Sequence, residues 1–248
     1  NANDGIALCQ TMEGALDETT TMLQRIRTLA IQAANGTNTT VDRVAIQQEI
    51  AQLSEEITRI ACKTTFAGRQ CLAGVDGADK GGVLDSKGQC AFQVGAYAFD
   101  TLSISMSKGF TLSGIFQSAH PGIDITKKDK TAEQTAGLYI GADGHFEFNC
   151  YTQCNAQYTI QAIDDLINIV DSKRAELGAI QNRMESTIRN QENVAENVSD
   201  ARSRIRDADY AEESSNLAAQ NIIQQAATTI LTQANQRPSI AMSLLNGG

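Results

Sequence analysis

Apolar side chains recur at alternating steps of three and four residues between Asp4 and Ala34. This spacing places them on one face of a helix, and its regularity is typical of helices that pack lengthwise against other helices. Asn35-Gly36 should end the helix, because glycine readily adopts the left-handed conformation of a C-cap. The stripe consists of Cys9, Met12, Leu16, Thr19, Leu23, Ile26, Ala30 and Ala33.

A second helix is predicted after a short polar loop at Thr37–Thr39. Thr40 is a suitable N-cap, since its hydroxyl can accept a hydrogen bond from a free backbone N–H of the first turn. The short link predicts that the two helices form an antiparallel hairpin. The apolar stripe of the second helix is Ile46, Ile50, Leu53, Ile57 and Ile60.

The helical period is lost over residues 63–154, which are rich in Gly, Thr, Ser and Phe. Residues 101–106 alternate between polar and apolar, as a half-buried strand does, and they follow the segment Phe92–Gly95. Residues 141–148 are typical of a hairpin with one similar strand. Turns are expected at Gly81-Gly82, Lys87-Gly88 and Asp143-Gly144.

A sustained helical period returns near Thr159 and continues to Ala208. At roughly 1.5 Å per residue a helix over 160–208 would be about 70 Å long, which is typical of a bundle or coiled coil. Three positions of the stripe are polar: Lys173, Thr187 and Gln191. The others are Ile163, Leu166, Val170, Leu177, Ile180, Met184, Val194, Val198, Ala201, Ile205 and Ala208.

The last stretch, Glu212–Leu245, has a broad apolar face with few charges. Pro238 should interrupt this helix, because proline lacks a backbone N–H and its ring clashes with the preceding turn. A contiguous apolar face of this kind needs a partner, and we interpret it as a polymerisation surface. Its main residues are Leu217, Ile223, Ala227, Ile230 and Leu231.

These elements predict a mainly α fold with a small β region: a long antiparallel helical bundle or coiled-coil rod with a β-hairpin element inserted in the middle. The expected domains are a discontinuous helical rod core (1–72 and 155–208), a β-rich and loop part with a minimal variable region (73–154), and a C-terminal tail helix (209–248).

Composition excludes several functions. The chain of 248 residues has a formal net charge of -9, and clustered Lys and Arg are what phosphate backbones require, so nucleic acid is not an expected partner. No apolar run reaches the roughly 18 residues that suggest a transmembrane helix, so membrane insertion is not expected either.

The chemistry of the side chains favours a protein that is not an enzyme. No His-Glu-x-x-His motif accompanies the two histidines, His120 and His145, and no catalytic constellation or cofactor motif stands out. Cys150 and Cys154 with His145 give three soft ligands at loose spacing without a fourth, so we predict no metal site. The six cysteines are interpreted as free thiols in apolar positions, with disulfides, including Cys150–Cys154, as the alternative.

Several blocks of the chain match known motifs in their order. Residues 203–211 (Ser-Arg-Ile-Arg-Asp-Ala-Asp-Tyr-Ala) are the most diagnostic block, and 92–96 (Phe-Gln-Val-Gly-Ala) are a further hallmark. Other blocks are 1–7, 13–16, 23–30, 32–38, 224–226 and 233–236. Together they resemble the bacterial flagellins over 1–72, 90–106 and 159–248. Residues 1–7 look like the flagellin segment that joins the N-terminal tail helix to the first rod helix, so the start of that tail helix is expected to be missing.

The resemblance implies a structural subunit of the flagellar filament, which self-assembles into a helical tube for motility. It implies a secreted, extracellular protein of the bacterial flagellum, exported unfolded, whose partners are other flagellin subunits, an export chaperone and the filament cap. The alternatives are a hook–filament junction protein and a cell-surface flagellin relative that binds polysaccharide. The sequence of 73–154 reveals no sugar site, such as an exposed aromatic platform with flanking carboxylates.

The resemblance also implies innate immune recognition by the host toll-like receptor for flagellin. The corresponding patch resembles Arg25, Leu29 and Gln32 on the first helix with Glu49 on the second. The chain departs from the family pattern at Thr28, where an acidic residue is common. The alternative interpretation is that Arg25 and Glu49 are solvated helix charges.

Overall fold

The computed structural model describes residues 1–248 except 75–80, 107, 122–136, 141–145 and 248. Contacts within the chain divide it into two compact units, Asn1–Gln191 and Glu192–Gly248, and each is described by itself. No helix among the described residues has the length and apolar content to cross a membrane.

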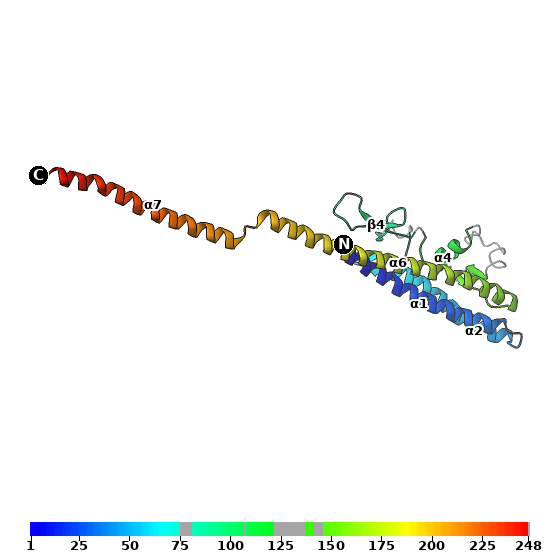
Figure 1. The fold of residues 1–248 in the computed structure, drawn as a ribbon. Coiled ribbons are helices and arrows are strands. Elements are labelled where there is room, and N and C mark those ends of the chain that lie inside the picture. The colour runs from blue at the N-terminus through cyan, green and yellow to red at the C-terminus, as the bar shows by residue number, and fades with distance from the viewer. Residues whose placement is uncertain (75–80, 107, 122–136, 141–145, 248) are drawn as a thin grey trace. The chain divides into compact units, whose positions relative to one another are not determined.

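Among the described residues, long helices form the body of the first unit (Figure 1). They are α1 (Ala2–Ala34), α2 (Thr40–Lys63) and the part of α6 (Gln153–Arg206) that precedes Glu192. Ion pairs join α1 to α6: Arg27 Nε lies 2.6 Å from Asp164, and Arg174 lies 2.9 Å from Asp17. The predicted helical hairpin and the long helix are therefore confirmed, although the long helix begins seven residues earlier than 160 and ends two before 208.

The caps of the first two helices differ from the prediction by small shifts. Asn35, in an extended conformation, ends α1, and Gly36 is not among the residues with positive φ, so the left-handed glycine cap was wrong. Thr39, not Thr40, caps α2, because Asp42 at the third helical position completes a capping box with the Thr39 backbone.

The core of this unit is the apolar stripe read from the sequence. All eight predicted stripe positions of α1 are buried, Thr19 among them. On α2 the buried face is rotated: Ser54 and Ala61 are buried, whereas Leu53 and Ile60 are only half-buried. Ser54 donates to the Ile50 carbonyl 2.8 Å away, which satisfies its hydroxyl without an external partner.

Among the described residues, the β region contains three separate antiparallel pairs. β1 (Thr65–Phe66) pairs with β2 (Arg69–Gln70), β3 (Gln89–Gln93) with β4 (Thr101–Ser105), and β5 (Leu138–Ile140) with β6 (Phe146–Phe148). The predicted strand after Phe92–Gly95 and the strand at the end of 141–148 are both present. The turns expected at Gly81 and Lys87-Gly88 coincide with positive φ at Gly81 and Gly88, and the one at Asp143-Gly144 lies outside the described residues.

A short helix, α4 (Leu112–Ala119), was not predicted. Thr111 caps it by accepting a hydrogen bond from the Gly114 N–H. Leu112, Ile115 and Phe116 are buried. Eight residues contain too few turns for a helical period to stand out from an apolar run.

The second unit holds the end of α6 and α7 (Tyr210–Leu245), separated by Asp207–Asp209. The Asp209 carboxylate caps α7 by accepting from the Ala211 N–H at 2.9 Å. Pro238 lies inside a continuous helix, so the predicted interruption was wrong. The carbonyl that Pro238 leaves without its usual donor lies on an exposed helix, where water can satisfy it.

Candidate interaction surfaces

The first predicted surface lies where α1 and α2 run side by side. Arg25 Nε donates to Glu49 Oε1 at 2.8 Å, and about half of each side chain remains exposed. Gln32 is exposed one turn beyond Leu29, and its backbone carbonyl accepts from the Asn35 N–H. Leu29 itself is only 3% exposed, so its side chain belongs to the core beneath this surface. The structure thus brings Arg25 of α1 and Glu49 of α2 together.

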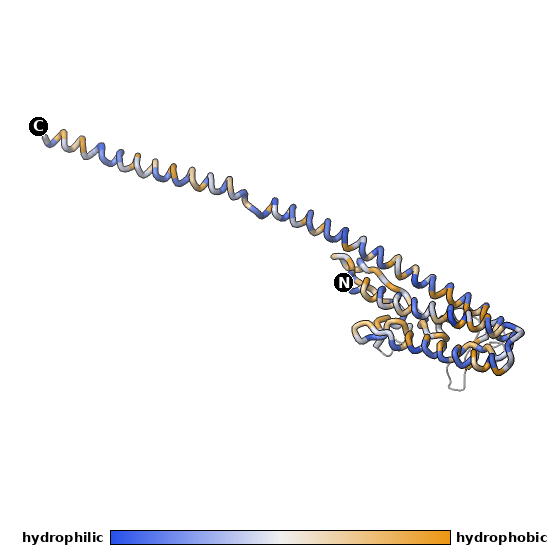
Figure 2. The backbone as a smooth tube through the Cα atoms, turned by 90° about the horizontal axis from the view of Figure 1, so that it is seen from below, coloured by the Kyte–Doolittle hydropathy of each residue, from blue (hydrophilic) through white to orange (hydrophobic). Residues whose placement is uncertain are grey.

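The second predicted surface lies on α7, where no described residue is buried. The exposed fractions are 64% for Leu217, 59% for Ile223, 65% for Ile230 and 63% for Leu231. Ala227, between them on the same face, is also exposed. Figure 2 shows hydrophobic residues recurring among hydrophilic ones along this helix. No described residue of the chain covers this face.

The apolar stripe of α6 is buried in its first part and exposed in its last part. Up to Met184 its apolar positions are buried within the first unit. Beyond Gln191 every described residue is exposed, including Val194, Val198 and Ile205. The same apolar period therefore forms a core in one segment and an unpacked surface in the next.

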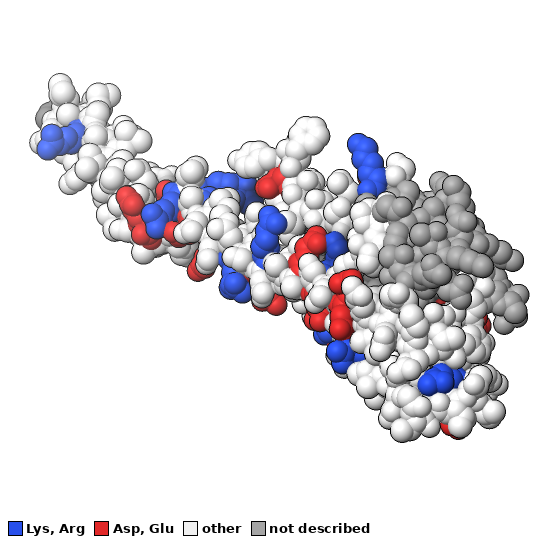
Figure 3. All heavy atoms as spheres, turned by 90° about the vertical axis from the view of Figure 1, so that its right-hand side faces the viewer, with Lys and Arg blue, Asp and Glu red and all other residues white. Residues whose placement is uncertain are grey.

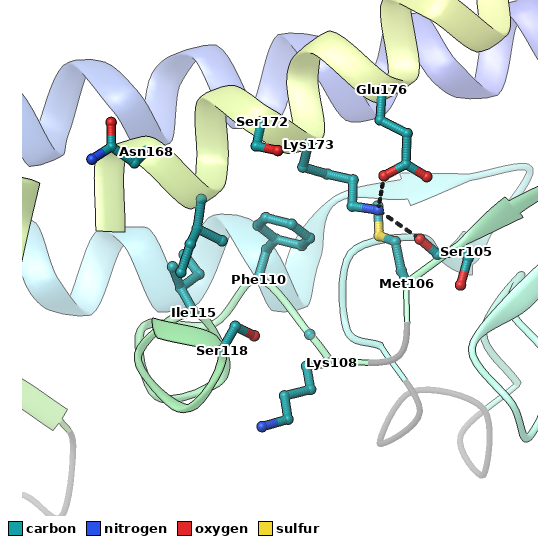
Figure 4. Close-up of a pocket in the computed structure, with 12 residues that line it drawn as sticks. Ser105, Met106, Lys108, Phe110, Ile115, Ser118, Asn168, Ser172, Lys173 and Glu176 are labelled. Atoms are coloured by element: carbon teal, nitrogen blue, oxygen red, sulfur yellow. Dashed lines mark hydrogen bonds and ion pairs between the residues drawn. The ribbon is translucent and has the colours of Figure 1, made fainter. Parts of the chain in front are cut away.

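The polar position Lys173 of this stripe faces a hollow of about 480 Å³ between α6 and the segment from β4 to α4 (Figure 4). Its ammonium donates to the Ser105 carbonyl at 2.8 Å and pairs with Glu176 at 2.5 Å. Met106, Phe110 and Ile115 line the apolar side of the hollow. Lys173 thereby ties β4 to α6, which explains why the stripe tolerates a charge here.

The cysteines are mostly enclosed. Cys9, Cys71 and Cys150 are buried, Cys62 and Cys90 are intermediate, and Cys154 is exposed, all as free thiols. Burial raises the pKa of Cys9, Cys71 and Cys150 to about 11 in each case. Among the described residues no group of three or more His, Cys, Asp or Glu is placed to hold a metal ion, and His145, one of the three ligands considered, lies outside them.

Charges on the face drawn in Figure 3 are interspersed, with positive and negative side chains side by side. No extended surface of one sign is visible there.

A helical bundle with small β pairs, and a long amphipathic helix on which no described residue is buried, define a class of protein: a subunit that packs with helices of other subunits. Comparison with known families identifies it. Residues 1–76 match the bacterial flagellin N-terminal helical region, and residues 160–245 match the bacterial flagellin C-terminal helical region. The chain belongs to the bacterial flagellin family.

Named relatives agree with this. Polar flagellin F of Vibrio parahaemolyticus is 34% identical, over 99% of this chain and 82% of the relative. Flagellin B of Vibrio cholerae is 35% identical over the same shares. The crystal structure of Bacillus cereus flagellin is similar, with a TM-score of 0.56 and 26% identity over 77% of this chain and 87% of that one. FliC of Burkholderia pseudomallei, at 23% identity and a TM-score of 0.53 over 72% of this chain and 99% of that one, shares the fold.

Membership of the bacterial flagellin family establishes the general function of the protein. The protein is a structural subunit of the bacterial flagellar filament and assembles with other flagellin subunits into this extracellular appendage. Flagellins are a structural family, and the relatives support the filament over the hook–filament junction.

Proposed function

We propose that the apolar face of α7, together with the exposed apolar stripe of α6 beyond Gln191, forms the contact that holds subunits in the filament. The observation that carries this proposal is the exposure of every described residue from Glu192 onward, despite a sustained apolar period. Burying side chains of this size contributes about 1.5–3 kcal/mol each, so a few of them drive assembly. In this proposal the chain has a rod domain (1–72 and 155–208), a β region (73–154) and a tail (209–248) that carries the α7 contact.

An assembly assay tests this contact. Full-length protein with Ile230→Asp is added to sheared filament seeds, and elongation is followed by electron microscopy. The charge would be buried among apolar side chains, so elongation should be lost. Thr232→Asp is the matched control, because position 232 points about 200° away from position 230 on the same helix. Equal elongation by wild type and Ile230→Asp would refute the proposal.

We also propose that other proteins cover α7 before assembly, because exposed contiguous apolar surfaces promote aggregation. An export chaperone that covers this face inside the cell, and a filament cap that holds arriving subunits at the tip, would provide that shielding. Co-purification of the chaperone with wild type but not with Ile230→Asp is the expected result. Retention of the chaperone by a protein truncated before Tyr210 would contradict it.

We further propose recognition by the host toll-like receptor for flagellin through Arg25, Gln32 and Glu49, with Leu29 as their buried support. The paired Arg25 and Glu49 side chains are held by their 2.8 Å contact, which reduces the entropy lost on binding. In a reporter-cell assay Arg25→Ala should weaken the response at least about tenfold, as expected for an interface arginine.

Arg59→Ala is the control for this assay, because Arg59 forms a similar exposed pair with Glu56 on α2. It should leave the response unchanged. An unresponsive wild-type protein, or equal losses from both substitutions, would rule out this recognition surface.

A further inference from the structure

Two cysteines from distant parts of the chain lie where β3 packs on the first turns of α1. Asn1 Nδ2 donates to the Gln93 carbonyl at 3.1 Å. A Cβ added at Gly5 would come within 3.4 Å of the Phe92 ring and within 2.6 Å of the Met184 sulfur, so the missing side chain lets these elements approach closely. The contacts fix the direction of β3 against α1: as α1 advances from Asn1 to Gly5, β3 goes back from Gln93 to Phe92.

The same direction brings Cys9 opposite Cys90. Cys9 follows Gly5 by one helical turn on the same face, a rise of about 6 Å. Cys90 precedes Phe92 by two residues on the same side of the strand, a distance of about 7 Å. Burial alternates along β3, with Cys90 and Phe92 half-buried against the core and the residues beside them exposed. The two thiols therefore occupy matching positions of the α1–β3 contact.

The electrostatics of the two thiols agrees with this placement. Burial is the main cause that raises the pKa of Cys9 to about 11, and the charge of Cys90 is the second. Burial also raises the pKa of Cys90, and the Arg69 guanidinium opposes that rise. Cys9 has no exposed surface, whereas Cys90 is only half-buried, so a reagent in solution reaches Cys90 first.

We propose that Cys9 and Cys90 are a reversible dithiol pair whose oxidation to a disulfide links the start of α1 to the β3–β4 hairpin. Both thiols are free in the structure. The flagellar filament is extracellular, and disulfides persist in oxidising surroundings outside the cell. The pair is separate from the filament contact on α7 and does not depend on it.

The oxidant is a low-molecular-weight disulfide, and the reaction consists of two thiol–disulfide exchanges. The Cys90 thiolate attacks one sulfur of the reagent, whose S–S bond breaks and releases one thiolate. The Cys9 thiolate then attacks the Cys90 sulfur of the mixed disulfide and releases the second thiolate. The released thiolates take up the two protons that the protein thiols lost, so two protein thiols are oxidised and one reagent disulfide is reduced.

The cross-link would close a loop that contains the whole α1–α2 hairpin. A long closed loop restricts the unfolded chain more than the folded one, which shifts the equilibrium toward the folded state. The midpoint of urea denaturation should therefore be higher for the oxidised protein than for the reduced protein. In Cys90→Ala the oxidant should not change the midpoint. An oxidised wild-type midpoint below the reduced one would overturn the proposed pair, because the bond would then distort the fold.

The direct test is peptide mapping of the whole protein after incubation with oxidised glutathione and an acid quench. In wild type a disulfide-linked peptide pair should join Cys9 to Cys90, with no glutathione retained on either, and dithiothreitol should restore both thiols. Cys62→Ala is the matched control, because Cys62 is half-buried like Cys90, and this substitution should leave the link intact.

Two further variants separate the steps of the reaction. Cys9→Ala should trap glutathione on Cys90, because the second exchange has lost its thiol. Cys90→Ala should leave Cys9 unmodified, because Cys9 has no exposed surface. Circular dichroism spectra equal to that of wild type would show that both variants fold. Glutathione that stays on Cys90 of the wild type, a bond from Cys90 to another cysteine, or an unreacted Cys90 would each overturn the proposal.

Discussion

At the residue scale, Gln47 joins α2 to the segment after β6. It is 2% exposed; its Nε2 donates to the Phe148 carbonyl and its Oε1 accepts from the Cys150 N–H, both at 2.7 Å. Gln47→Leu would leave two buried backbone groups unpaired, so we expect the free energy of unfolding to fall by about 3 kcal/mol in urea titrations. The neighbouring Gln48 is exposed, and Gln48→Leu should change it by less than about 0.5 kcal/mol.

The thiols provide a second test at this scale. Because burial raises the pKa of Cys9, Cys71 and Cys150 to about 11, only about one thousandth of each is thiolate at pH 8. Exposed Cys154 should therefore react first with a thiol reagent, and the buried three should react slowly, at rates that rise about tenfold per pH unit up to pH 11. Peptide mapping after timed labelling checks the order; equally fast labelling of Cys9 and Cys154 would contradict it.

At the element scale, two glycines test different effects: Gly14 lowers the helix propensity of α1, whereas Gly74 is required because a side chain would not fit. An added Cβ at Gly14 in α1 meets nothing within 4 Å, so Gly14→Ala should stabilise the protein by about 1 kcal/mol. Gly74 has a φ of 65°, and a Cβ there would approach the Gly109 nitrogen to 2.2 Å. Gly74→Ala should therefore destabilise by about 2 kcal/mol or more. Midpoints of urea denaturation compare the two; a loss of stability in Gly14→Ala would show that α1 is packed on that side.

At the scale of the whole molecule, stability is distributed unequally between the two units. The buried core lies within residues 1–191, whereas every described residue from Glu192 onward is exposed. A helix gains most of its stability in proteins from packing, so α7 in a dilute monomer should exchange its amide hydrogens quickly. Hydrogen-exchange mass spectrometry should show slow exchange in α1 and the start of α6 and fast exchange over 210–245. Protection of 210–245 at high dilution would mean that α7 is already paired.

The apolar period alone determined the helical elements. The stripes of α1 and the first part of α6 are buried as predicted, because a spacing of three and four residues permits only one helical face to be packed. The motifs at both ends of the chain likewise determined the family, which the matches to 1–76 and 160–245 confirm. The predicted ends of the helices were less accurate, because a helix cap depends on a single hydrogen bond such as the one that Thr39 accepts.

Only the tertiary structure decided how positions of equal hydropathy are used. Val170 and Val198 are the same residue type on the same stripe, yet one is fully buried and the other is 61% exposed, because packing partners come from distant parts of the chain. The exposure of Tyr97 and Phe99 was not predicted from the sequence for the same reason: the direction of these side chains depends on the backbone of the β3–β4 loop. Thr187 and Gln191, two polar residues of the apolar stripe of α6, line a polar groove that only the structure reveals.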